Sequence, residues 1–216
     1  MAEDEVTIGI DEVGRGCVWG PVYMAAFARV GHPKLPGVKD SKAFKSPVTR
    51  TNISERLKSA GVWLVASVPA SAINDHGIEQ CLNTMAAMLM RQMAGRLVEL
   101  GRSEAKMIFD GDQYPNKTMF VGGVKLICES IPKADATCYE VSAASMIAKT
   151  DRDIFCFEWG KAHPEYVKYH IGENKGYGTA GHADAIAEYG RLTDHRTQYV
   201  NTLLETRSRK MIQGVA

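Results

Sequence analysis

Two adjacent carboxylates, Asp11 and Glu12, stand near the N-terminus at the end of a short apolar stretch. Residues 6–10, Val-Thr-Ile-Gly-Ile, have the composition of a buried strand. An acidic pair at the end of a core strand needs a strong partner, because a buried unpaired charge is costly. A divalent cation is such a partner; a hairpin tip with solvated acids is the alternative. The Gly-Arg-Gly turn at 14–16 follows, and its glycines let a backbone approach a ligand closely.

A dinucleotide-binding fingerprint is another reading of this segment. That motif places glycines in the pattern G-x-G-x-x-G between a strand and a helix. Here the glycines stand at 14, 16 and 20, one residue too wide, and residues 22–28 after them are strand-like. The acids also precede the glycines instead of following them by about twenty residues. The spacing therefore disfavours a nucleotide cofactor.

Two further acids, Asp110 and Asp135, extend the candidate metal site. Asp110 ends a predicted strand at 106–110, and Asp135 lies shortly before a predicted helix. If the strands that end at Asp11 and Asp110 are parallel neighbours, both carboxylates lie at one sheet edge, where open α/β sheets place ligands. A set of carboxylate oxygens suits Mg²⁺ or Mn²⁺ better than zinc. Taken alone, each aspartate could equally be a cap or a turn residue.

The carboxylates belong to a series of motifs in a fixed order. The blocks are Gly9-Ile10-Asp11-Glu12-Val13-Gly14-Arg15-Gly16, Lys39-Asp40-Ser41-Lys42, Phe109-Asp110-Gly111, Lys133-Ala134-Asp135 before Ser142–Lys149 and Arg152-Asp153, Asn174–Thr179 with His182, and His195-Arg196. This series resembles type 2 ribonuclease H, the ribonuclease HII family, over nearly the whole chain. One block would be weak evidence, but six in order are specific.

The resemblance implies a metal-dependent endoribonuclease with a ribonuclease H-like fold. It implies cleavage of the RNA strand of RNA/DNA hybrids, and nicking of duplex DNA on the 5′ side of embedded ribonucleotides, leaving 3′-hydroxyl and 5′-phosphate ends. Two divalent ions, Mg²⁺ or Mn²⁺, are expected on Asp11, Glu12, Asp110 and Asp135, with Asp11 bridging both. Membranes are not an expected partner, and no protein partner is indicated.

Substrate recognition is expected to centre on the ribose 2′-hydroxyl, which distinguishes RNA from DNA. The resemblance assigns this role to the backbone of Gly14, Arg15 and Gly16 and to Tyr177, whose ring would stack on the next sugar. Ser41 and Lys42 follow a Pro-Gly turn and could contact phosphates. Lys149, Lys175 and Arg196 are further candidates for phosphate contacts. The alternatives are a surface aromatic for Tyr177 and a solvated loop charge for Lys42.

The sequence departs from the family pattern at three places, one of which is the stretch before Asn174, lengthened by Tyr169-His170-Ile171-Gly172. Cys17-Val18-Trp19-Gly20 stands where the family usually has Pro-Leu-x-Gly, and Thr197-Gln198-Tyr199 stands where Arg-Ser-Phe is common. None of the departures removes a carboxylate. They therefore bear on substrate contacts more than on the chemistry.

Composition is that of an ordinary globular chain, with 216 residues, 45% hydrophobic and 24% charged. The formal net charge of +1 means that any basic surface must be local. Five cysteines without a Cys-x-x-Cys pair and six histidines without a His-x-x-x-His pair give no support to zinc. No apolar run is long enough to span a bilayer. A cytoplasmic location is expected, because reduced thiols are the simplest reading of an odd set of cysteines.

The element pattern predicts a mixed five-stranded sheet flanked by helices, with a small C-terminal helical subdomain. Strands are expected at 6–11, 20–30, 62–68, 106–110 and 124–128, and helices at 47–60, 78–100, 138–161, 180–190 and 197–209. Ser46-Pro47 has the pattern of an N-cap followed by proline at the first helical position. The domains expected are residues 1–190, catalytic, and 191–216, a helical extension packed on the same domain. The rival functions are a DNA junction resolvase or nuclease of the same fold, and a binding module without catalysis.

Overall fold

The computed structural model describes residues 6–29, 31, 34–36, 38, 46–114 and 116–212, without the side chains of 211 and 212. Ser41 and Lys42 lie outside the described residues. The chain forms two compact units. One, here the sheet unit, consists of Met1–Val13, Tyr23–Ala66 and Leu82–Thr150, and the other, here the helical unit, consists of Gly14–Val22, Ser67–Cys81 and Asp151–Ala216. The expected division at residue 190 remains a prediction.

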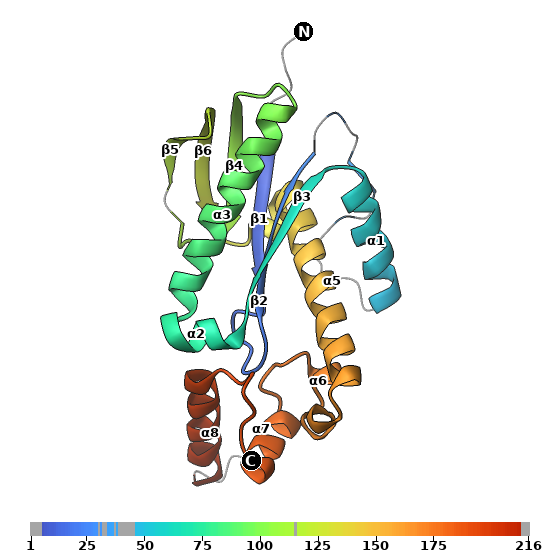
Figure 1. The fold of residues 1–216 in the computed structure, drawn as a ribbon, viewed down its shortest axis with the longest axis vertical. Coiled ribbons are helices and arrows are strands. Elements are labelled where there is room, and N and C mark those ends of the chain that lie inside the picture. Colours follow the sequence, from blue (N-terminus) through green and yellow to red (C-terminus); the bar gives the residue numbers. More distant parts are fainter. Residues whose placement is uncertain are drawn as a thin grey trace. The chain divides into compact units, whose positions relative to one another are not determined.

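The strands all lie before residue 132, and helices joined by loops make up the described chain after it (Figure 1). The strands are β1 (Thr7–Val13), β2 (Val22–Ala28), β3 (Val62–Val68), β4 (Glu104–Asp110), β5 (Lys117–Val121) and β6 (Val124–Ile131). The helices are α1 (Pro47–Ser59), α2 (Ala70–His76), α3 (Ile78–Glu99), α4 (Ala134–Thr137), α5 (Tyr139–Ala162), α6 (Ile171–Asn174), α7 (Ala180–Tyr189) and α8 (Thr197–Ile212), with a 3₁₀ helix η2 (Pro164–Tyr169). Ser46 caps α1 as predicted, since its side chain accepts the Thr49 N–H at 3.4 Å.

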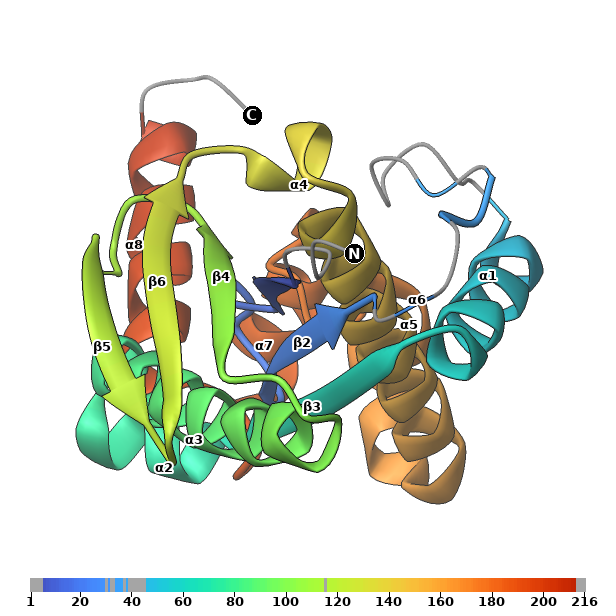
Figure 2. The same cartoon turned by 90° about the horizontal axis from the view of Figure 1, so that it is seen from above.

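The strands form one mixed sheet in the order β3-β2-β1-β4-β6-β5. β1 is antiparallel to β2 and parallel to β4, and β4 is parallel to β6. The mixed sheet is confirmed, but it has six strands rather than five. The additional strand, β5, pairs with β6 as an antiparallel hairpin at the edge of the sheet (Figure 2). Its residues are largely exposed, so they carry none of the apolar periodicity by which a strand is predicted.

Helices cover both faces of the sheet in the sheet unit (Figure 2). The first half of α5 packs against Ala25 and Phe27 of β2 through small apolar residues between Ala143 and Ala148. Gly9 of β1 faces the start of this helix, and a Cβ there would lie 2.1 Å from backbone atoms of Glu140 and Val141. Glycine is therefore required at this position, because any side chain would separate α5 from β1. The other face is covered by α3.

The helical unit has a separate aromatic core around Trp19. Its ring is fully buried and packs against Phe155, Trp159 and Tyr166, with centroid separations of 6.2, 6.0 and 5.7 Å. Val18 belongs to the same cluster. The family departure at residues 17–19 thus supplies core packing in this chain.

In the part of the chain that the structure describes, no helix is long and apolar enough to cross a membrane.

Candidate active site

Three of the four predicted metal ligands converge in the sheet unit. Asp11, Asp110 and Asp135 each offer a carboxylate oxygen, and these oxygens all lie within 4.8 Å of one another. Asp11 lies in β1 and Asp110 ends the neighbouring parallel strand β4, so the sheet brings both to one edge as the sequence predicts. Asp135 reaches the same place from the first turn of α4, and its side chain is buried.

The short α4 segment is fixed by hydrogen bonds at this edge. The Ala134 N–H donates to Asp110 Oδ1 at 2.7 Å, so a ligand carboxylate also orders the turn that carries Asp135. The Ser142 hydroxyl donates to the backbone carbonyl of Asp135. Lys133 enters the helix with φ 59, in the left-handed region, which costs roughly 1 kcal/mol for a non-glycine residue. The surrounding contacts hold Asp135 in place against this cost.

The metal-free cluster is electrostatically unfavourable, and Asp11 shows this most clearly. Its side chain is only 7% exposed, and its pKa is raised from 3.8 to about 8. Burial is the largest cause, a hydrogen bond with Ser145 opposes it, and the charges of Asp110, Glu12 and Asp135 raise the pKa further. A divalent cation would relieve both the burial of charge and the repulsion. Carboxylate oxygens are also the donors that Mg²⁺ and Mn²⁺ prefer, so the residues present fit the expected ions.

Glu12 is not part of the converging group. It is half-buried and stands one residue before the end of β1. Its backbone N–H donates to Asp11 Oδ1 at 2.8 Å, and its charge contributes to the raised pKa of Asp11. A metal-ligand role for Glu12 remains a prediction.

The Gly-Arg-Gly turn lies in the helical unit as part of the segment 14–21, here the glycine loop. Gly14 has φ +84, a conformation that favours glycine, and its carbonyl accepts the Cys17 N–H at 3.3 Å. Arg15 forms an ion pair with Glu79. Gly16 is exposed, with open space where a side chain would stand.

Tyr177 lies beside the glycine loop. The N–H groups of Val18 and Trp19 both donate to the carbonyl of Gly176, at 2.9 and 3.2 Å. The Tyr177 side chain is 40% exposed, and its pKa is raised to about 12 by burial of the hydroxyl and by the neighbouring Cys17. The structure thus brings together the glycine loop and the tyrosine expected to read the ribose, although they are more than 150 positions apart in the sequence.

The structure places the three other candidates for phosphate contacts, Lys149, Lys175 and Arg196, in different surroundings. Lys149 is half-buried on α5. The Lys175 ammonium donates a hydrogen bond to the carbonyl of Gly172. Arg196 is fully buried, and its guanidinium donates to the carbonyls of Gly20 and Arg15 at 3.0 and 2.8 Å. The expectation of a phosphate contact for Arg196 is therefore wrong, because this side chain supports the glycine loop from inside.

Residues that sequence reasoning did not assign also support these loops. Arg152 is fully buried and donates to backbone carbonyls of the glycine loop. His182 and His195 form a buried pair with 3.1 Å between their Nε2 atoms. Arg152, His182 and His195 all stand in the family blocks, and this could have marked them as functional. Their burial could not be predicted, because it depends on chain segments that meet only in the folded unit.

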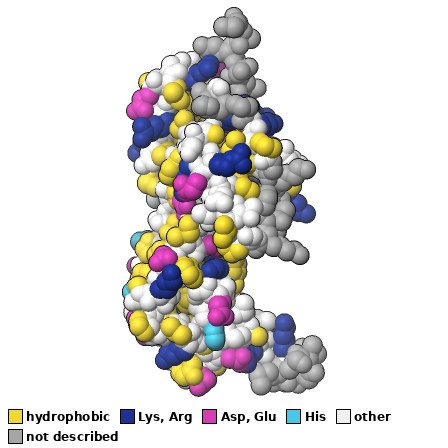
Figure 3. All heavy atoms as spheres, turned by 90° about the vertical axis from the view of Figure 1, so that its right-hand side faces the viewer, with side chains coloured by type: hydrophobic (Ala, Val, Ile, Leu, Met, Phe, Trp, Pro, Cys, Tyr) yellow, Lys and Arg dark blue, Asp and Glu magenta, His cyan; other side chains and the backbone are white. Residues whose placement is uncertain are grey.

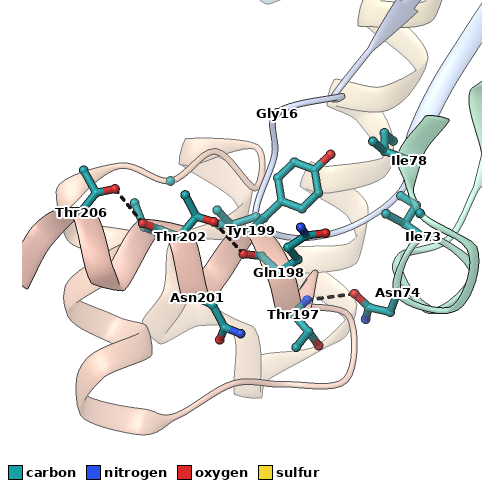
Figure 4. Close-up of a pocket in the computed structure, with 14 residues that line it drawn as sticks. Gly16, Ile73, Asn74, Ile78, Thr197, Gln198, Tyr199, Asn201, Thr202 and Thr206 are labelled. Carbon is teal, nitrogen blue, oxygen red and sulfur yellow. Dashed lines mark hydrogen bonds between the residues drawn. The ribbon is translucent and has the colours of Figure 1, made fainter.

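A cavity of about 940 Å³ opens beside Gly16 in the helical unit (Figure 4). Most of its polar lining is uncharged and comes from the start of α8, including Gln198, Tyr199 and Thr202, with Asn74 opposite. Asn74 Oδ1 accepts the Thr197 N–H at 2.8 Å and so holds the start of α8. The departure from the family pattern at residues 197–199 therefore lines a cavity that adjoins the glycine loop.

Comparison with known proteins identifies the family. The family model described as Ribonuclease HII matches residues 8–202. A ribonuclease HII of Neisseria meningitidis serogroup C is 35% identical over 195 residues, covering 90% of this chain and 92% of that protein. Among solved structures, the ribonuclease HII in a PCNA complex from Archaeoglobus fulgidus aligns with a TM-score of 0.64 at 24% identity, covering 89% of this chain and 93% of that one. Bst ribonuclease HIII in complex with Mn²⁺ aligns with a TM-score of 0.65 at 20% identity, covering 95% of this chain and 71% of that one. Matched along nearly its whole length, the chain belongs to the ribonuclease HII family.

Proposed function

We propose that this chain, a metal-dependent ribonuclease H of RNA/DNA hybrids by its family, also nicks duplex DNA on the 5′ side of embedded ribonucleotides and leaves 3′-hydroxyl and 5′-phosphate ends. The convergence of Asp11, Asp110 and Asp135 on one sheet edge carries the proposal. A non-catalytic binding module would have no reason to bring three repelling carboxylates together, two of them buried. A cytoplasmic location is part of the proposal.

Asp11, Asp110 and Asp135 would hold two divalent ions, with Glu12 as a further ligand. When bound, such ions activate water and stabilise the charge that develops on the phosphate and the departing 3′ oxygen. The protein contributes the fixed positions of the carboxylates. Asp110 is held by the Ala134 N–H and Asp135 by the α4 turn, so the ligand set needs little reorganisation during reaction. The Mn²⁺ complex of the related ribonuclease HIII supports this class of ion.

Selection of the ribose falls to the helical unit in this proposal. The Gly16 backbone is exposed and unshielded by any side chain, so its amide and carbonyl can approach a sugar closely. The Tyr177 ring, 40% exposed on the neighbouring turn, offers a stacking surface, and its hydroxyl is a donor for the 2′-oxygen. That hydroxyl is protonated at physiological pH, since even the ordinary tyrosine pKa of about 10 lies well above it and burial raises the value further.

The decisive experiment uses duplex DNA with one ribonucleotide, incubated with protein and Mg²⁺ or Mn²⁺. We expect a single nick on the 5′ side of the ribonucleotide, with 3′-hydroxyl and 5′-phosphate ends, and no product from the all-DNA duplex. Asp110→Asn serves as the inactive control because it removes a ligand charge without changing side-chain size. Cleavage of the all-DNA duplex or of a four-way junction would favour the resolvase alternative. Binding without metal-dependent turnover would favour the non-catalytic module.

A further inference from the structure

Arg152 joins two segments of the helical unit that are far apart in the sequence. It is fully buried on α5. Its Nε donates to the Pro21 carbonyl at 2.9 Å and its Nη2 to the Trp19 carbonyl at 3.4 Å, both on the glycine loop. Its Nη1 donates at 2.8 Å to the carbonyl of Lys175, two residues before Tyr177. The turn at 174–177, here the Tyr177 turn, is closed by the bond from the Tyr177 N–H to the Asn174 carbonyl. One planar guanidinium thus fixes the separation of the glycine loop and the Tyr177 turn.

The contacts of Arg152 depend on its shape more than on its charge. All three hydrogen-bond acceptors are backbone carbonyls, and the described part of the chain gives it no carboxylate partner. Burying a cation without an anion is costly, and a lysine would carry the same charge with fewer directed donors. The fork of N–H donors explains why arginine occupies this position.

The glycine loop is built to admit the Arg152 side chain. A Cβ on Gly14 would lie 2.2 Å from Arg152 Nε. Glycine is therefore needed at position 14 for two reasons: the turn requires its positive φ, and the Arg152 guanidinium occupies the space of a side chain. On the other side, Arg152 Cζ lies 5.8 Å from the centroid of the Tyr177 ring, within the range of a cation–π contact.

We propose that Arg152 is a positioning residue that sets the geometry between the glycine loop and Tyr177, and thereby the preference for a ribonucleotide embedded in DNA. The inference rests on the proposed function, because it assigns the two segments to ribose recognition. Arg152 itself touches no substrate. It acts through Tyr177, whose ring it contacts and whose turn it anchors.

Arg196 supplies a matched control for Arg152. It is equally buried and also donates to glycine-loop carbonyls, those of Gly20 and Arg15, but within the described residues its side chain makes no hydrogen bond to the Tyr177 turn. Arg152→Lys and Arg196→Lys should therefore cost similar stability. Only Arg152→Lys should release the Tyr177 turn.

The test is a double-mutant cycle with Tyr177→Ala. For each variant, kcat/KM is measured on duplex DNA with one ribonucleotide and on a continuous RNA/DNA hybrid, and the ratio is the readout. We expect Arg152→Lys to lower the ratio roughly tenfold in the parent protein, the scale of one or two lost hydrogen bonds to a charged group. In the Tyr177→Ala background the further loss should vanish. Arg196→Lys should show no such dependence on Tyr177.

A second readout needs no catalysis. Hydrogen exchange of the Val18 and Trp19 amides, which bond to Gly176, should speed up in Arg152→Lys and stay protected in Arg196→Lys. Additive effects of Arg152→Lys and Tyr177→Ala, or unchanged amide protection, would overturn the inference. Arg152→Gln replaces Arg152→Lys if the latter does not fold, and failure of both to fold would make Arg152 purely structural. Absence of ribonucleotide cleavage in the parent protein would instead contradict the proposed function, while the exchange result would stand.

Discussion

At the scale of single residues, Asp11 should make the metal-free protein less stable at high pH. Its pKa is about 8 in the folded state and 3.8 in the unfolded chain, so the folded state binds more protons between these values. Stability is therefore lost as pH rises from about 4 to 8, by up to several kcal/mol. Asp11→Asn should raise the urea midpoint of the metal-free protein at pH 8 and change it little at pH 4.5. An equal loss of stability at both pH values would indicate a packing role.

The buried histidine pair has one consistent arrangement of protons when neutral. His195 Nδ1 accepts the Leu192 N–H at 3.0 Å, so the His195 proton lies on Nε2. That proton is donated to His182 Nε2, and His182 Nδ1 is left to donate to the Tyr177 carbonyl at 3.0 Å. A chain of three hydrogen bonds therefore runs from Leu192 to the Tyr177 turn.

Amide substitutions at His182 should separate the two ends of this chain. Asn places its amide near Nδ1 and can still donate to the Tyr177 carbonyl, whereas Gln places its amide near Nε2 and can still accept from His195. We expect His182→Asn to retain more activity on a single embedded ribonucleotide than His182→Gln, by several-fold, because it keeps the bond that holds the Tyr177 turn. Equal activity of the two variants would show that the pair acts by packing alone.

Acid should unfold the protein partly through the same histidines. Burial and the neighbouring His182 lower the pKa of His195 to about 4, below its ordinary 6.5, so the unfolded chain binds the additional proton between these values. The stability from neutral His195 is fully present above pH 6.5 and is lost as pH falls toward 4, by roughly 3 kcal/mol. Denaturation of His195→Gln by urea at pH 7 and pH 4.5 should show a smaller difference than in the parent. A pH dependence as steep as the parent's would mean that other groups cause the acid loss.

At the scale of elements, the contact between β1 and α5 should tolerate no side chain at Gly9. The clash in Gly9→Ala is with the backbone of Glu140 and Val141, which cannot rotate away, so α5 must shift from the sheet. Overpacking of this kind typically costs 1–3 kcal/mol. Because α5 carries Ser145, which hydrogen-bonds Asp11, cleavage should fall as well.

Gly95→Ala on α3 is the matched control for this prediction. Gly95 lies within a helix and has no atom within 4 Å of an added Cβ. Alanine there should stabilise the protein by about 0.5–1 kcal/mol. Urea denaturation of both variants gives the comparison. A neutral Gly9→Ala would contradict the close approach of α5 to β1.

The sequence predicts the parts of the site that depend on regular elements. Asp11 and Asp110 each end or lie in an apolar strand, so parallel pairing of those strands was enough to predict their meeting. Glu12 has the same sequence context as Asp11, but the converging carboxylates are those of Asp11, Asp110 and Asp135, and a ligand role for Glu12 stays a prediction. The burial of Arg152 and Arg196 could not be read from sequence, because arginine is usually exposed and the carbonyls that hold these side chains come from distant segments.

At the scale of the whole molecule, the charges nearly balance. The formal net charge is +1, and on the face shown in Figure 3 Lys and Arg side chains are interspersed with Asp and Glu. Binding of nucleic acid releases counterions in proportion to the phosphates that the protein neutralises. The acidic cluster adds local repulsion of phosphates that only divalent cations can reverse.

Divalent cations should therefore stabilise the protein, and more strongly at high pH. An ion that binds only the folded state adds about 1.4 kcal/mol at ten times its Kd. Below pH 8 the ion must displace the proton of Asp11, so each unit by which the pH falls should weaken binding of the ion by about tenfold. Melting temperatures measured with and without Mg²⁺ or Mn²⁺ should differ at pH 8 and nearly coincide at pH 5.5. Asp110→Asn, which removes a ligand charge but leaves Asp11 in place, should abolish the difference at both pH values. A shift independent of pH, or retained in Asp110→Asn, would place the stabilising ion away from Asp11, Asp110 and Asp135.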